Sequence, residues 1–195
     1  MSSRNVRSAN PTRERILDAA AHYSRAMHRQ PAIAELARHA GVSRPTVYRY
    51  FTDGDALFRA LWEREIGVIL DAHSFDFTTL DDLVARIVQI ADEISRHELL
   101  APTLHPTQTA DSALVAHYIV DRFGTSQRLV FDRLRTAIED GQAAGGVRRG
   151  QADELTAMVM LIVQSAVQSR AMIAEFLDDR AWARELGQAI RGYLQ

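Results

Sequence analysis

The sequence contains no cysteine and no lysine, and it has no long hydrophobic run. Without cysteine there are no disulfides, thiolate metal sites or cysteine nucleophiles, which fits a reducing compartment. The longest unbroken apolar run is the seven-residue AMVMLIV at 157–163. A helix needs about 20 apolar residues to cross a bilayer. The N-terminal segment contains arginines but no apolar core, so it does not have the pattern of a secretory signal peptide. We therefore expect a cytoplasmic, nucleoid-associated protein without a membrane span.

Acidic and basic residues are unevenly distributed, although the formal net charge is only −2. Residues 1–51 contain nine arginines and three acids, a balance of +6, whereas the remaining residues contain 14 arginines and 22 acids, a balance of −8. A basic segment at one end of an otherwise acidic chain predicts a surface for a polyanion that is confined to that end.

Hydrophobic residues recur at helical spacing along almost the whole chain, and strand-like alternation is nowhere sustained. The pattern predicts an all-α fold. Helices are expected to begin near Asn10, Ile33, Ser43 and Asp53, to pass through Leu83–Ile94 and Leu129–Ile138, and to include a helix near 108–122. Two further helices are predicted at 153–176 and 180–195. The first of these is apolar nearly all round, so we expect the pair to form a homodimer with a second copy.

The stretch IAELARHAGVSRPTVYRYF at 33–51 predicts two short helices joined by a tight turn. Gly41 ends the first helix, and Ser43 is well placed as the N-cap of the second. Ala37 allows the helices to approach closely, and Val47 is expected to face inward. This arrangement is that of a helix-turn-helix, whose second helix enters the major groove of DNA.

The first 62 residues resemble the TetR family of bacterial transcriptional regulators. The resemblance rests on RILDAAAHYSRAM followed by IAELARHAGVSRPTVYRYFTDGDALFRALW, in which GVS, VYRYF and LF form a specific signal. It implies a DNA-binding domain at 1–52 and a helical regulatory and dimerisation domain at 53–195. The residues that match DNA-contacting positions of the family are Ser43, Arg44, Thr46, Tyr48, Arg49 and Tyr50.

The chain departs from the family pattern at positions where phosphate contacts are common. A Thr-rich start to the second helix is replaced by Pro31-Ala32, and a lysine at the head of the fourth helix is replaced by Gly54. The glycine usual at the end of the first helix is missing from AMHRQ. We expect the loss of these phosphate contacts to weaken DNA binding. The arginines at 4, 7, 13 and 29 are candidates to replace the lost contacts. The segment 1–9 is a candidate minor-groove arm.

Several large apolar residues are candidates for lining an effector pocket and fit the core equally well: Trp62, Phe75, Phe77, Tyr118, Phe123, Met158 and Met172. The histidines at 73, 97, 105 and 117 match no metal-ligand spacing, so neither a metal nor another cofactor is predicted. The acid pairs at 81–82 and 178–179 fit helix starts better than catalysis, because the helix dipole favours acids there.

The leading hypothesis is a homodimeric repressor that binds a near-palindromic operator in double-stranded DNA and is released by a small, fairly apolar effector. The helix at 43–51 of each subunit is expected to enter successive major grooves about 34–36 Å apart. Two alternatives stay open. One is an enzyme or small-molecule carrier that keeps the helix-turn-helix as a scaffold, although no nucleophile–base spacing or glycine-rich phosphate loop is present. The other is a protein-interaction module.

Overall fold

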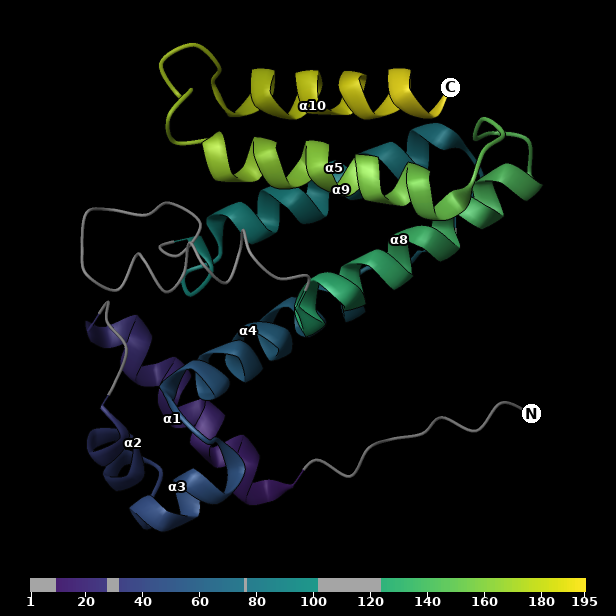
Figure 1. Cartoon of the computed structure of the whole chain (residues 1–195). Helices are drawn as coiled ribbons and strands as arrows, with labels where there is room; N and C mark the ends of the chain where they lie inside the picture. The colour runs from purple at the N-terminus through teal and green to yellow at the C-terminus, as the bar shows by residue number, and fades with distance from the viewer. Residues whose placement is uncertain (1–9, 28–31, 76, 102–123) are drawn as a thin grey trace. The chain divides into compact units, whose positions relative to one another are not determined.

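The computed structural model describes residues 10–27, 32–75, 77–101 and 124–195, and every regular element in these ranges is an α-helix (Figure 1). This confirms the predicted all-α class. The predicted helix near 108–122 and the arm at 1–9 lie outside the described residues. No helix of the described ranges is long and apolar enough to span a membrane. The helices are α1 (Pro11–Met27), α2 (Ile33–His39), α3 (Arg44–Tyr50), α4 (Gly54–Asp71), α5 (Leu80–Arg96), α8 (Thr125–Ala143), α9 (Ala152–Ser169) and α10 (Asp179–Leu194).

The chain forms two compact units, Met1–Arg64 and Glu65–Gln195, and the division between them falls inside α4. The helix begins where the sequence predicts it, because the Asp53 carboxylate accepts a hydrogen bond from the Ala56 amide at 2.6 Å. This bond lowers the pKa of Asp53, and the Thr52 hydroxyl lowers it further. The head of α4 is therefore fixed by its own local capping.

The first unit holds its three N-terminal helices around buried aliphatic side chains. The Asn10 carboxamide caps α1 by accepting from the Thr12 amide at 3.1 Å. Gly41 follows α2 with φ of +63°, a left-handed conformation that disfavours any residue with a Cβ. The predicted turn glycine is thus confirmed. The buried side chains that pack α1, α2 and α3 together are Ile16, Leu17, Ala20, Leu36, Ala37 and Val47.

In the second unit, α9 packs against α5, α8 and α10, and α10 also packs against α5. Figure 1 shows α9 and α10 running side by side in opposite directions. Helix α5 has one clearly apolar face, whereas α9 carries apolar residues on several sides. The central core residues of this unit are Leu83, Ile87, Ile90, Leu134, Ile138, Val159, Trp182, Leu186 and Ile190.

The predicted extent of the second-last helix, 153–176, is wrong at its C-terminal end, because α9 stops at Ser169 and the chain continues in turns. Directly after the helix, the side chain of Arg170 contacts Asp92 at 2.7 Å and Asp179 at 2.8 Å. These contacts hold the chain where it leaves the helix. Helix α10 then begins close to its predicted start, since the Asp178 carboxylate accepts from the Ala181 amide at 2.8 Å.

Candidate nucleic-acid interface

Helix α3 is only seven residues long, and its start is fixed by side chains of the helix itself. The Ser43 hydroxyl accepts from the Thr46 amide at 3.2 Å, which confirms the predicted N-cap. The two hydroxyls also lie 2.8 Å apart, within hydrogen-bonding distance of each other. Pro45 stands in the first turn, where its missing N–H costs little. Such a short helix gains from this cap because it is marginal in isolation.

One side of α3 is buried and the other carries large polar side chains to the surface. Val47 is fully buried, and Phe51, directly after the helix, is also buried. Arg44 and Arg49 are exposed, and Tyr48 exposes 52% of its surface. Because Arg44 and Tyr48 are four positions apart, they follow one another along the same face. This face has the chemistry of a DNA-reading helix, with a guanidinium and an aromatic ring on a rigid backbone.

Tyr50 differs from these residues, because it is half-buried and its hydroxyl is engaged within the protein. The hydroxyl donates to the Asn10 carboxamide oxygen at 3.1 Å. The Arg49 guanidinium lies 5.3 Å from the centroid of the Tyr50 ring. Burial acts to raise the pKa of Tyr50, but the hydrogen bond and the positive charge of the Arg49 guanidinium act against it, and the pKa is lowered. The sequence patterns did not reveal this bond, because its partners are far apart in the chain.

The three acids of residues 1–51 all have partners inside the first unit. Arg64 contacts Asp18 at 2.7 Å and Glu14 at 3.6 Å. The Glu35 carboxylate accepts from the Ala32 amide at 3.2 Å at the start of α2. Their negative charges are therefore partly compensated locally, and Arg44 and Arg49 of α3 are exposed.

Comparison with known proteins connects this geometry to a family. The model for bacterial regulatory proteins of the tetR family matches residues 31–61. Uncharacterized HTH-type transcriptional regulators of Mycobacterium tuberculosis and Mycobacterium bovis are 38% identical to this chain over 162 residues, which cover 83% of it and 82% of each relative. The chain belongs to the TetR family. Because the family and these relatives are transcriptional regulators, this chain is a transcriptional regulator. This assignment rejects the enzyme alternative.

Solved structures of TetR-type regulators share the fold at low sequence identity. FadR of Bacillus subtilis, solved with stearoyl-CoA, is 15% identical with a TM-score of 0.62 and covers 93% of this chain and 99% of its own. RolR, solved with resorcinol, is 17% identical with a TM-score of 0.67, over 94% of this chain and 87% of its own. SmeT, solved with triclosan, is 20% identical with a TM-score of 0.59, over 92% and 91%. These likenesses extend the fold assignment beyond the 31–61 segment.

The candidate effector-lining residues lie in several different places. Trp62 is buried in the first unit, 5.8 Å from Phe58 between ring centroids. Phe75 and Phe77 are half-buried in the second unit and meet edge to face at 6.0 Å.

The other four candidates are either exposed or outside the described residues. Met158 and Met172 expose 44% and 74% of their surface. Tyr118 and Phe123 lie outside the described residues. Within the second unit, the structure therefore brings Phe75 and Phe77 together.

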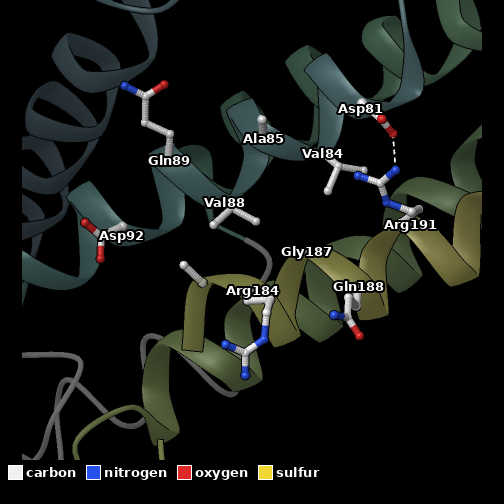
Figure 2. Close-up of a pocket in the computed structure, with 11 residues that line it drawn as sticks. Asp81, Val84, Ala85, Val88, Gln89, Asp92, Arg184, Gly187, Gln188 and Arg191 are labelled. Atoms are coloured by element: carbon white, nitrogen blue, oxygen red, sulfur yellow. Dashed lines mark hydrogen bonds and ion pairs between the residues drawn. The ribbon is translucent and has the colours of Figure 1, made fainter. Parts of the chain in front are cut away.

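The second unit carries an open groove of about 700 Å³ between α5 and α10, which sequence patterns did not predict (Figure 2). Val84 and Val88 from α5 and Gly187 from α10 form its apolar floor. Its end is closed by an ion pair between Asp81 and Arg191. The groove requires both helices, so it exists only in the folded unit.

Two histidines of the second unit are engaged with charged side chains. His73 lies between Glu93, at 2.7 Å from Nε2, and Arg86, at 2.9 Å from Nδ1. His97 faces the buried carboxylate of Glu65 at 3.6 Å. No three potential metal ligands converge in the described part of the chain. In this structure both histidines tie α5 to neighbouring segments.

Proposed function

We propose that this TetR-family regulator is a homodimeric repressor that binds a near-palindromic operator through α3 and is released by a small, fairly apolar effector. Residues 1–52 form the DNA-binding part in this proposal, and residues 53–195 form the regulatory and dimerisation part. The observation that carries it is the α3 surface, where Arg44, Tyr48 and Arg49 are exposed on a helix whose opposite side is buried.

The six matched residues divide by what their side chains already do. Arg44, Tyr48 and Arg49 present their side chains to solvent and are the proposed contacts to base edges and phosphates. Ser43 and Thr46 hold the start of α3 and turn its amides toward a phosphate. Tyr50 stands at the other end of the helix, next to Arg49.

A homodimer through α9 and α10 supplies the second recognition helix. Leu161 exposes 62% of its surface on α9, and Met158 is exposed one turn before it. A pair of antiparallel helices with uncovered apolar side chains fits a two-fold bundle of four helices. Two copies of α3 about 34–36 Å apart then require half-sites one helical turn apart.

The dimer is proposed to have two forms, in which the recognition helices lie at different spacings. An effector releases the operator only if it binds these two forms with different affinity. FadR, RolR and SmeT were solved with stearoyl-CoA, resorcinol and triclosan, all with apolar parts, which supports an apolar effector here. Helix α4 is the proposed lever, since it begins beside the DNA-binding segment and ends in the second unit. The aromatic pair Phe75 and Phe77 is the proposed effector contact among the described residues of that unit.

The experiment is selection of duplex DNA from a randomised pool by the full chain, followed by anisotropy titrations across a salt series. We expect a near-palindromic sequence to be enriched, with affinity falling about 10³- to 10⁵-fold between 50 and 200 mM salt if each dimer makes 6–10 phosphate contacts. No enriched sequence together with a flat salt response contradicts the proposal and favours the protein-interaction alternative.

A further inference from the structure

The seven residues of α3 offer a narrow range of groups for reading bases. The helix reads RPTVYRY, so it contains no Asn or Gln, which pair with adenine, and no Asp or Glu, which accept from cytosine. Val47 is buried, and the Thr46 hydroxyl lies 2.8 Å from the Ser43 hydroxyl at the helix cap. The polar groups of α3 that remain for a duplex are therefore two guanidinium groups and two tyrosine hydroxyls.

Arg44 stands at the end of α3 from which bases are read. It is the first residue of the helix, and it is exposed. In a helix-turn-helix, the N-terminal residues of the second helix contact base edges in the major groove. A guanidinium group only donates hydrogen bonds, and guanine is the base that presents two acceptors there, O6 and N7. The chemistry of Arg44 therefore selects guanine.

Arg49 has the same charge but lies in the last turn of α3, beside a fixed aromatic ring. Its guanidinium carbon lies 5.3 Å from the centroid of the Tyr50 ring. The Tyr50 hydroxyl donates to Asn10 Oδ1 at 3.1 Å, and the same oxygen caps α1 by accepting from the Thr12 amide. The ring is thus anchored to the start of α1. An exposed guanidinium held at this end of the helix suits a backbone phosphate, which it binds in a bidentate way.

We propose that Arg44 reads a guanine in each half-site of the operator, and that Arg49 binds a backbone phosphate without selecting a base. This inference rests on the proposed DNA binding and gives different tasks to two arginines of one helix. Loss of Arg44 then changes which sequence is bound, whereas loss of Arg49 weakens binding to every sequence alike.

The test compares the two arginines on the full chain. Wild type, Arg44→Ala and Arg49→Ala each select duplexes from a randomised pool. Each is also titrated by anisotropy, at several salt concentrations, against the duplex that the wild type enriches. Arg38→Ala, at an exposed position of α2, is the matched control for loss of one arginine from the first unit. Thermal unfolding of every variant is measured in parallel.

A modified base isolates the contact of Arg44. In 7-deazaguanine a carbon replaces N7, which removes one major-groove acceptor and leaves the pairing edge intact. Each guanine of the half-site is replaced in turn. We expect one position at which wild-type binding falls about tenfold, as for loss of a hydrogen bond to a charged group. At that position Arg44→Ala should bind the modified and the unmodified duplex equally, whereas Arg49→Ala should discriminate as the wild type does.

The selections should separate the two arginines in the same way. Arg44→Ala should lose the preference for guanine at that one position and keep the preferences at the others. Arg49→Ala should enrich the wild-type sequence, with a salt slope that is shallower by about 1 for each protomer. Arg38→Ala should retain both the sequence and the slope of the wild type.

Three results would overturn this assignment while leaving DNA binding intact. They are a wild-type half-site without guanine, an Arg44→Ala chain that still discriminates against 7-deazaguanine, and an Arg49→Ala chain that selects a different sequence. Failure of the wild-type chain to enrich any duplex instead contradicts the proposed function. The wild-type selection alone therefore distinguishes the two kinds of failure.

Discussion

The guanidinium carbon of Arg170 lies 4.2 Å from the centroid of the Trp182 ring, and the guanidinium nitrogens bridge two carboxylates. Arg96 contacts the same carboxylates, at 3.0 Å from Asp92 and 2.8 Å from Asp179. We call Asp92, Arg96, Arg170 and Asp179 the Arg170 cluster. It joins the C-terminal part of α5 to the first residue of α10 and to the end of α9.

Removing Arg170 should destabilise the second unit. The side chain is largely buried and stacks on Trp182, so Arg170→Ala removes packing as well as ion pairs and leaves Asp92 without one of its partners. We expect the free energy of unfolding to fall by about 2–3 kcal/mol, less than for a fully buried pair because both carboxylates are partly exposed. Urea denaturation measures this. Arg180→Ala, at an exposed position of α10, is the control and should change stability by less than about 0.5 kcal/mol.

The same cluster predicts an acid-sensitive stability. Burial acts to raise the pKa of Asp92, but hydrogen bonds from Arg96 and Arg170 lower it below its ordinary value, and Arg170 and Arg96 also lower the pKa of Asp179. A folded-state pKa below the unfolded value contributes stability that is complete above about pH 4 and is lost as pH falls further. Urea midpoints between pH 6 and pH 3 should therefore fall less for Asp92→Asn than for wild type. Asp140→Asn, at an exposed site of α8, should retain the wild-type pH profile.

Local signals in the sequence predicted much of the fold because their physical causes are local. The Ser43 hydroxyl caps α3 by accepting a hydrogen bond from the amide of Thr46, three positions later. Gly41 adopts the positive φ that its place in the turn predicts. The ion pair of Arg170 with Asp92 was not predictable in this way, because Asp92 is far away in the sequence and gives no signal near 170. The Asn10 partner of Tyr50 is hidden for the same reason.

The buried and exposed positions of α3 were predictable from the sequence, whereas the lining of the α5–α10 groove was not. The former lie on one seven-residue helix, where spacing alone separates buried Val47 from exposed Tyr48. A pocket is formed by residues from several helices, and an apolar side chain there has the same sequence pattern as a core residue. The α5–α10 groove illustrates this, since its valines belong to an ordinary amphipathic pattern.

Tyr48 and Arg49 should be required for operator binding and dispensable for folding. Both side chains are exposed, so Tyr48→Ala and Arg49→Ala remove surface groups without opening the core. We expect each to weaken specific binding by about 1–3 kcal/mol, or roughly 5- to 150-fold, in anisotropy titrations. Arg38→Ala, at an exposed arginine of α2 that we interpret as solvated, is the control. Equal reductions in Arg49→Ala and Arg38→Ala would indicate a general charge effect.

Gly54→Lys should strengthen DNA binding. A Cβ at Gly54 meets no atom within 4 Å, so the substitution is sterically free, and family members commonly carry a lysine at this position. We expect the salt slope to steepen by about 1 for each protomer, because the new ammonium neutralises one more phosphate. Gly54→Glu should do the opposite, and Gly54→Ala separates the side-chain charge from the removal of glycine. An unchanged affinity in Gly54→Lys would place the head of α4 away from the phosphates.

Leu161→Glu should dissociate the proposed dimer without unfolding the protomer. Leu161 exposes 62% of its surface on α9, so a glutamate there is solvated in the monomer but is buried without a partner in a four-helix interface. Light scattering after gel filtration should show a monomer, and operator affinity should fall because two half-sites are no longer bound together. Val68→Glu is a closely matched control, because Val68 exposes 63% of its surface on α4. If Val68→Glu dissociates the dimer and Leu161→Glu does not, the interface uses α4 and the assignment to α9 and α10 is wrong.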